Sequence, residues 1–319
     1  MQVRSLRQWA IVSAVTLIAG CAGNQRVMMA DIELQSTAIE LVDTPFYPQI
    51  TDQCGPSALA TILNVAGVDV SPLRLKSNIY IPGRQGSLQL EMLAATRSYE
   101  RVPYILEAGI SAVFSELEAG RPVLVLQNLG TDNRPVWHYA VVVGFLPGEK
   151  TFVLRSGDQE RYRIKAAKFL RSWRRAGYWA MVALQPGTVP DRANPEMYLS
   201  ALAAFESTGN DAATIAAYVA AVAKWPENTL AGLGLGNAYY ADGQLVAAQQ
   251  AYAAVLRVDP QNALILNNLA QVLHASGSNS EAAETIAVAL SLADVDSREY
   301  WLILQTQQEI SQPGNKPPQ

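Results

Sequence analysis

The second half of the sequence repeats itself every 34 residues. A glycine, a bulky apolar or aromatic side chain and a proline each recur at this interval. The columns are Gly209, Gly243 and Gly277; Tyr218, Tyr252 and Ile286; and Pro226 and Pro260. The spacing predicts units of helix, turn glycine, helix and closing proline. Because one helix pair leaves an apolar face that only a neighbouring pair can cover, we expect the units to stack in an array.

This pattern resembles the tetratricopeptide repeat. The resemblance covers about residues 194 to 293, close to three units, and small side chains recur where paired helices would approach, at Ala213, Ala248 and Ala282. A plain helical bundle is the alternative, but a register kept in three independent columns favours the repeat. We expect an all-α repeat domain with a capping helix over 194–310, followed by a disordered tail over 311–319. The resemblance implies that the repeats bind a protein partner or a substrate.

Residues 1–20 have the features of an export signal. Arg4 and Arg7 give a positive start, and Trp9 to Ile18 is mostly apolar but shorter than the roughly 20 residues of a membrane span. Ile18-Ala19-Gly20-Cys21 resembles the lipobox of bacterial lipoproteins. The resemblance implies a cut before Cys21, lipidation of that residue, and an outer-membrane location facing the periplasm, because Ala22 stands where an aspartate commonly retains lipoproteins in the inner membrane. An ordinary signal peptide or membrane anchor with a chance cysteine is the alternative.

The mature chain is mildly acidic. The signal holds two arginines and no acidic residue, so 22 basic and 28 acidic residues remain, a net charge of −6. This balance argues against nucleic-acid binding, and no second apolar stretch is long enough to span a membrane. We expect a tether over 21–40 and enough chain beyond it for two ordinary cores. Two cysteines and two histidines far apart in the sequence predict no metal site, and no cofactor is expected.

Residues 41–186 mix helical and β-type patterns. Helices are expected at about Gly55 to Ala66, Leu88 to Arg97 and Ile110 to Ala119. Strands are expected at 123–126, 138–145, 151–155 and 178–184, with a hairpin turn at Pro147-Gly148-Glu149-Lys150. Helices followed by antiparallel strands are typical of an α+β domain. A break at Pro186-Gly187-Thr188-Val189-Pro190 predicts a linker over 187–193 before the repeats.

Cys54 is the only thiol expected in the body of the mature protein, and it lies at the start of a predicted helix. The unpaired N–H groups and dipole at such a helix end favour the thiolate, which is the form that attacks a carbonyl. Of the two histidines, His274 lies on a repeat helix and His138 opens an apolar strand of the mixed half. One cysteine and one histidine in this setting are the minimum set for cysteine catalysis. An inert buried cysteine and a structural histidine are the alternatives.

Three segments of this half together resemble the papain-fold cysteine peptidases. They are Pro45-Phe46-Tyr47-Pro48-Gln49, Cys54-Gly55-Pro56-Ser57-Ala58-Leu59-Ala60 and His138-Tyr139-Ala140-Val141-Val142-Val143-Gly144. The nearest group is family thirty-nine, typified by bacteriocin leader processing after a double glycine, and the resemblance covers about residues 41–186. It implies Cys54 as nucleophile, His138 as general base and acid, and Gln49 as donor to the oxyanion. Gln53 is the alternative oxyanion donor.

The third catalytic position departs from the family pattern. That pattern places an aspartate soon after the next strand, often followed by proline, whereas this strand ends in Arg155-Ser156-Gly157-Asp158. Asp158 is therefore shifted and lacks the proline. Asp158, Ser156 or a backbone carbonyl is expected to orient His138, and an ordinary turn role for Asp158 is equally open.

The sequence thus predicts a lipid-anchored periplasmic cysteine peptidase, a hydrolase with a papain-like α+β domain followed by all-α tetratricopeptide repeats that recruit substrate or partner. Two alternatives stay open. One is a catalytically inactive peptidase-like scaffold for envelope protein interactions. The other is amidase or transglutaminase-type action on cell-wall peptides with the same residues.

Overall fold

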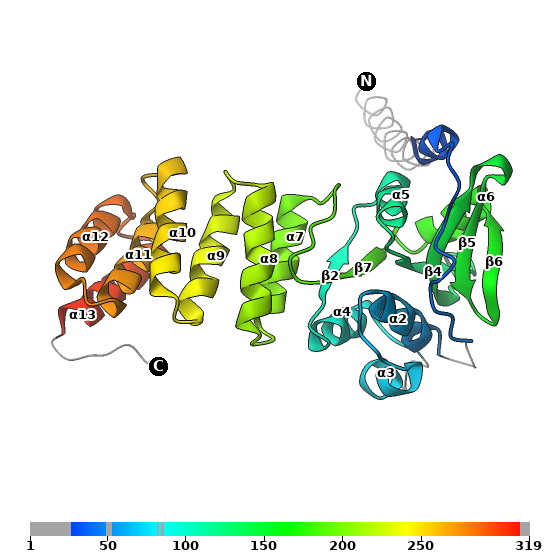
Figure 1. Cartoon of the computed structure of the whole chain (residues 1–319), viewed down its shortest axis with the longest axis horizontal. Helices are drawn as coiled ribbons and strands as arrows, with labels where there is room; N and C mark the ends of the chain where they lie inside the picture. Colours follow the sequence, from blue (N-terminus) through cyan, green and yellow to red (C-terminus); the bar gives the residue numbers. More distant parts are fainter. Residues whose placement is uncertain (1–26, 49–52, 82, 84–85, 313–319) are drawn as a thin grey trace, which may run out of the picture. The chain divides into compact units, whose positions relative to one another are not determined.

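The structure, a computed structural model, describes residues 27–48, 53–81, 83 and 86–312. The expected signal, Cys21, Gln49 and the chain from residue 313 lie outside the described residues. The chain divides into two compact units. The first runs to Leu184 and includes Pro190–Ala193, and the second comprises Gln185–Val189 and the chain from Asn194 onward. One unit mixes helices and strands, and the other is helical (Figure 1). No helix in the described part of the chain is long and apolar enough to cross a membrane.

A seven-stranded antiparallel sheet forms the frame of the first unit. The strands are β1 (Ile39–Glu40), β2 (Val102–Ile105), β3 (Val123–Asn128), β4 (Trp137–Leu146), β5 (Thr151–Ser156), β6 (Gln159–Lys165) and β7 (Ala180–Leu184). Their order is β2-β7-β3-β4-β5-β6, and β1 pairs with β4 beside this path. A register shift between Val142 and Gly144 marks a bulge in β4. Glycine is needed at 144, because a Cβ there would overlap the carbonyl oxygen of Ile39.

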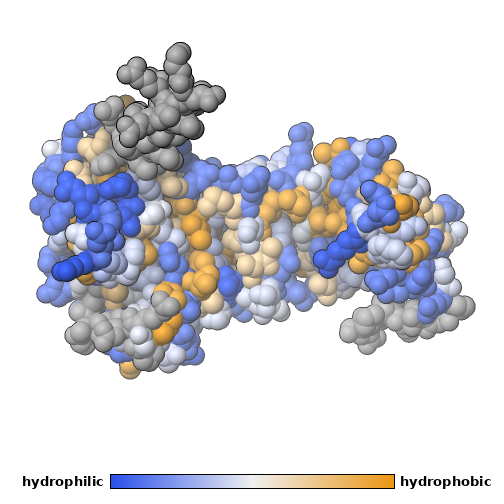
Figure 2. Space-filling model, turned by 180° about the vertical axis from the view of Figure 1, so that it is seen from behind, coloured by the Kyte–Doolittle hydropathy of each residue, from blue (hydrophilic) through white to orange (hydrophobic). Residues whose placement is uncertain are grey.

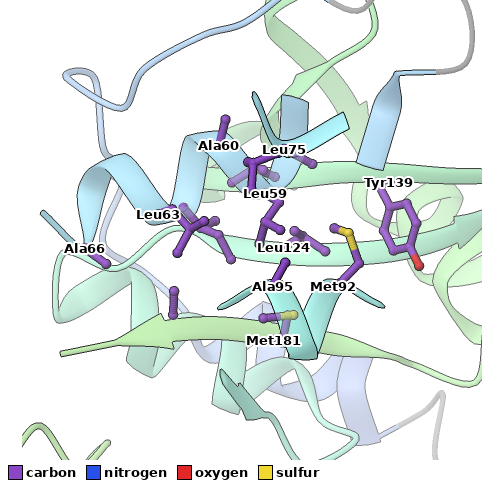
Figure 3. Close-up of a cluster of buried hydrophobic side chains, with 14 of the residues drawn as sticks. Leu59, Ala60, Leu63, Ala66, Leu75, Met92, Ala95, Leu124, Tyr139 and Met181 are labelled. Atoms are coloured by element: carbon purple, nitrogen blue, oxygen red, sulfur yellow. The ribbon is translucent and has the colours of Figure 1, made fainter. Parts of the chain in front are cut away.

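Three helices cover one face of this sheet. They are α2 (Cys54–Val65), α3 (Pro72–Ile79) and α4 (Gln89–Ser98). Pro56 suits the first turn of α2, where no N–H partner is needed, and Gly67 follows the helix with a left-handed φ of 83°. The helices and strands enclose a buried apolar cluster, with Leu59 contributed by α2, Leu124 by β3 and Met181 by β7 (Figure 3). This cluster fixes α2 against the middle of the sheet.

Helices α5 (Ile110–Glu118) and α6 (Ala166–Arg174) cover the opposite face. A chain of aromatic rings fills this side, with neighbouring centroids 4.6–5.9 Å apart. The rings are those of Phe114, Phe145, Phe152, Phe169 and Trp173. Side chains alternate along a strand, so Leu126 of β3 joins the α2 cluster while Gln127 donates to Ser172 of α6 at 2.7 Å. The site elements therefore stand on a sheet packed on both faces.

The predicted α+β class is confirmed, with some differences in detail. The strand expected from Tyr178 begins at Ala180, because Gly177 and Tyr178 both adopt left-handed conformations with φ of 67° and 58°. No element was expected at β2, β6, α3 or α6. Residues 27–34, within the expected tether, form a helix whose Met28 and Ile32 are each only 1% exposed. These two residues are one helical turn apart, so the helix buries one face against the unit.

The second unit is an array of helices, as the 34-residue period predicted. The described helices are α7 (Pro195–Glu206), α8 (Asp211–Lys224), α9 (Thr229–Ala241), α10 (Leu245–Val258), α11 (Ala263–Ala275), α12 (Asn279–Leu292) and α13 (Arg298–Ser311). The column glycines Gly209, Gly243 and Gly277 occupy the turns inside the pairs with left-handed φ values of 73°, 73° and 86°. Asn228 and Asn262 cap α9 and α11 by accepting from backbone N–H groups. The all-α class predicted for this half is confirmed.

Candidate active site

Cys54 is the first residue of α2 and is half-buried. The residue before it, Gln53, makes no side-chain cap for the helix, and the first turn contains no acidic residue. Within α2, therefore, neither a side-chain cap from Gln53 nor an acidic side chain of the first turn opposes negative charge at this end. Both conditions favour the thiolate of Cys54.

The thiol shares an apolar cluster with a residue near the start of β4. Cys54 packs on the apolar cluster that contains Tyr139, the residue after His138. Burial raises the pKa of the Tyr139 hydroxyl above its ordinary value, and negative charge on Cys54 and Glu91 raises it further. Figure 3 shows the Tyr139 ring beside Met92, with its hydroxyl directed away from the apolar cluster.

His138 is the second residue of β4 and pairs with Gln127 across the β3–β4 ladder. Its Nε2 atom lies 2.9 Å from the hydroxyl oxygen of Ser156, the last residue of β5. Burial lowers the pKa of the His138 imidazole below its ordinary value. The neutral form, which can accept a proton, is therefore favoured at neutral pH.

Of the three orienting groups left open by the sequence, the structure places Ser156 in contact with His138. Asp158 is exposed and lies with Gly157 in the turn between β5 and β6. Gln49 lies outside the described residues. The contact between Cys54 and His138 themselves stays a prediction. His274 lies on the repeats, where its Nδ1 is 2.9 Å from Asn279 Oδ1.

A buried arginine holds the backbone of the segment that precedes Gln49. The sequence alone does not predict this role. Arg155, only 5% exposed, donates from Nε and Nη2 to the Thr44 carbonyl oxygen at 3.1 and 2.9 Å, and from Nη2 to that of Val42 at 3.0 Å. Its Nη1 donates to the carbonyl oxygen of Glu160 at 2.6 Å. These bonds tie the backbone that leads toward Gln49 to the strand that carries Ser156. The only signal in the sequence is one arginine within an apolar strand.

Three buried polar atoms belong to α2, to α4 and to the residues just before α4. Ser57 Oγ, Ser87 Oγ and Glu91 Oε2 are buried without a hydrogen-bond partner among the described residues. Ser87 packs so closely on Gly55 that a Cβ there would lie 2.6 Å from its hydroxyl oxygen. Glycine at 55 therefore permits a close approach of this serine to the backbone beside Cys54. No group of three His, Cys, Asp or Glu side chains able to hold a metal ion occurs in the described part of the chain.

Two known protein families match parts of the chain. Residues 41–181 match the family model described as Peptidase_C39 like family, and residues 236–277 match the one described as TPR repeat. The chain is thus similar to the C39-like peptidase family over residues 41–181 and to the tetratricopeptide repeat over residues 236–277. The predicted resemblance to family thirty-nine and to the repeat is confirmed. No curated protein matches the chain.

Solved structures similar to each half are distant in sequence. A Bacillus anthracis protein described as a C39-like peptidase is 18% identical and aligns over 47% of this chain and 98% of its own, with a TM-score of 0.39. The peptidase domain of Streptococcus ComA, a bifunctional ABC transporter of a quorum-sensing pathway, is 20% identical over 44% and 98%, with a TM-score of 0.36. The Yersinia enterocolitica type III secretion translocator chaperone SycD is 19% identical over 36% and 81%, with a TM-score of 0.34.

Proposed function

We propose that the C39-like domain is a cysteine peptidase that cleaves peptide bonds with Cys54 as nucleophile and His138 as general base and acid. The observation that carries the proposal is the position of Cys54, the first residue of α2, packed on the same apolar cluster as Tyr139, the residue that follows His138. The N-terminal end of a helix favours a thiolate, and His138, the only histidine of the domain, is the second residue of β4.

The reaction is an acyl transfer. The Cys54 thiolate attacks the substrate carbonyl carbon, and the Cys54 backbone N–H together with Gln49 stabilises the oxyanion. His138 then protonates the leaving amine, and a water molecule activated by the same imidazole releases the acyl-enzyme. Because Nε2 of His138 contacts Ser156, Nδ1 is the nitrogen that exchanges a proton with the thiol and the leaving group.

The chain is proposed to be a lipoprotein of the cell envelope. The order of positive residues, apolar run, small residues and Cys21 supports lipidation, and Ala22 supports an outer-membrane location facing the periplasm. The repeats are proposed to recruit substrate or a protein partner. Leu230 on α9 and Trp301 on α13 are each 60% exposed and offer apolar contacts for such a chain.

A catalytically inactive scaffold is the second candidate, and one observation favours it. His138 contacts the neutral hydroxyl of Ser156, so the carboxylate that would stabilise an imidazolium is absent from this contact. Turnover then depends on how far the end of α2 alone lowers the pKa of the thiol.

Thiol alkylation and peptide turnover separate the two candidates. At about pH 6 an ordinary thiol with a pKa near 8.5 is almost wholly protonated, so rapid labelling of Cys54 would report a stabilised thiolate. General acid–base catalysis contributes typically about 10²–10⁴-fold, and we expect His138→Ala to reduce peptide turnover by this order. His274→Ala serves as the matched control. Envelope proteins captured by the Cys54→Ala variant serve as candidate substrates. If Cys54 is labelled no faster than a small thiol and none of the captured proteins is cleaved by the wild-type chain, the scaffold function is supported and the peptidase function is refuted.

A further inference from the structure

The end of the C39-like domain carries a concentration of positive charge that the proposed reaction does not use. Residues 161–175 contain seven arginines and lysines and no acidic residue, although the whole chain has a net charge of −4. They form β6, α6 and the residue after it. The whole chain has four more acidic than basic residues. The excess of basic residues in 161–175 is therefore a local feature and does not follow from the overall composition.

The positive charges of α6 point outward from the domain. Its apolar residues Phe169 and Trp173 are fully buried, while Lys168, Arg171 and Arg174 are exposed on the other side of the helix. These three residues, here called the α6 cations, are spaced three apart and therefore share a face of the helix. The β6 and α6 side of the domain, at the left of Figure 2, is strongly hydrophilic.

The α6 cations have no acidic partner among the described residues. The ion pairs in this region use Arg161 with Glu40, Arg163 with Glu149, and Arg175 with Asp132. Ion pairs elsewhere in the described chain do not include the α6 cations either. Three adjacent positive charges left unpaired on a rigid helix fit an anionic surface outside the protein.

The helix at 27–34 ties this surface to the proposed lipid anchor. Met28 and Ile32 of that helix are buried, and Glu33 pairs with Lys150 at 3.0 Å. The carbonyl oxygen of Lys150 accepts from the N–H of Ala166, the first residue of α6. Only five residues lie between Cys21 and Val27 in the sequence, and six peptide steps span at most roughly 20 Å. A lipid on Cys21 therefore keeps the start of the domain close to the bilayer.

We propose that the α6 cations bind the anionic phospholipid headgroups of the membrane in which the Cys21 lipid is inserted. The inference rests on the proposed lipidation. Attraction to a charged surface acts over about 8 Å at physiological ionic strength, and the short connection allows the domain to approach the bilayer within that range. A lipid surface is favoured over an acidic protein because the same membrane is held there by covalent attachment.

The contact would set the orientation of the catalytic domain. Helix α2, which begins with Cys54, packs on one face of the sheet, and α6 packs on the other. With α6 on the bilayer, the face that carries α2 is turned away from the lipid. The proposed peptidase site would then act on substrates in the aqueous space and not on segments embedded in the membrane.

The experiment uses the full lipidated protein in vesicles of phosphatidylethanolamine with or without phosphatidylglycerol. A fluorophore on the exposed position 167 (Ala167→Cys in a Cys54→Ser background) is quenched by a headgroup-labelled lipid. We expect strong quenching only with phosphatidylglycerol, and loss of most of it in Lys168→Gln/Arg171→Gln/Arg174→Gln and at high salt. The matched control Arg74→Gln/Arg257→Gln/Arg298→Gln removes three exposed charges elsewhere and should retain the quenching.

Three results would overturn the proposal. The first is equal quenching in both kinds of vesicle, and the second is equal quenching in both triple variants. The third is that the triple variant of the α6 cations loses quenching only because it self-associates, as detected by light scattering. Acylation of Cys21 is measured first by incorporation of labelled fatty acid. A chain that is not acylated refutes the anchor itself, whereas an acylated chain without the charge dependence refutes only the α6 contact, and peptide turnover is scored separately.

Discussion

His138 and Ser156 meet across β4 and β5, with the histidine Nε2 2.9 Å from the serine hydroxyl oxygen. A hydroxyl can hold the imidazole in one orientation, but it carries no charge to stabilise the imidazolium. Burial meanwhile lowers the pKa of His138. The site is therefore arranged to keep this histidine neutral, and the helix end at Cys54 must supply most of the stabilisation of a thiolate.

Replacing Ser156 with aspartate should extend the pH range in which thiolate and imidazolium coexist. A carboxylate near a cationic partner typically shifts a pKa by about 1–3 units toward the charged form, so the pKa of His138 should rise and that of Cys54 should fall. We expect alkylation of Cys54 at about pH 6 to accelerate by roughly tenfold, the effect of one pKa unit. The rate is measured across pH, with Ser156→Ala as control. Superimposed profiles for the two variants would contradict a charge effect at this position.

The lowered pKa of His138 also predicts how stability depends on pH. The folded imidazole binds a proton less readily than the unfolded one, whose pKa is about 6.5. The unfolded chain therefore takes up more protons as pH falls below that value, and the free energy of unfolding of the first unit must decrease. Denaturant titrations of the whole chain at successive pH values should show this slope, and His138→Asn should reduce it. If His274→Asn reduced the slope equally, His138 would not be its source.

Arg155 is expected to support both the fold and the reactivity of the site. Arg155→Met leaves the carbonyl oxygens of buried Thr44 and of exposed Val42 without their Arg155 donor, and hydrogen bonds to charged groups contribute about 1.5–3 kcal/mol each. We expect a loss of about 2–4 kcal/mol in the free energy of unfolding, measured by denaturant titration.

The same variant tests whether the Arg155 contacts position the site. Alkylation of Cys54 under fully folding conditions should slow as well, because the segment leading to Gln49 is no longer held. Arg163→Met, at an exposed arginine, is the control and should change both measurements little. A destabilised protein with unchanged Cys54 reactivity would limit Arg155 to a structural role.

The parts of this structure that a sequence can predict are those with local periodicity. Helix α2, strand β4 and the 34-residue repeat each carry it. In β6, Ile164 is the only fully buried residue, and charged side chains protect this edge strand, so its pattern is weak. The helix at 27–34 shows only Met28 and Ile32 on its buried face, too few to reveal a period.

The residue that orients His138 is not predicted by the sequence, for a different reason. Whether Ser156 or Asp158 reaches His138 depends on the register of the β4–β5–β6 hairpins. That register shifts between Val142 and Gly144 and again between Leu154 and Ser156. A bulge moves one side chain relative to its partner strand without changing the apolar pattern. Residue types alone therefore did not select the partner.

The close helix packing of the repeats depends on glycine in α9, and this gives a test independent of the C39-like domain. A Cβ on Gly236 would overlap the ring of Tyr252, and one on Gly234 would overlap the ring of Tyr218. Adding side-chain volume to a packed core typically costs about 1–3 kcal/mol. Gly236→Ala should therefore destabilise the repeats by this order, even though alanine favours helix over glycine.

A substitution of Tyr252 tests whether its ring is the reason for the cost of Gly236→Ala. Tyr252→Leu removes the ring from the contact, so adding Gly236→Ala to Tyr252→Leu should cost less than adding it to the wild-type chain. The coupling is measured as a double-mutant cycle by denaturant unfolding of the second unit's helices. Equal costs in the two backgrounds would mean that Gly236 is present for a reason other than space for Tyr252. Since Tyr252 also donates to Asn237 Oδ1 at 2.7 Å, Tyr252→Phe separates the hydroxyl from the ring and should leave the penalty of Gly236→Ala unchanged.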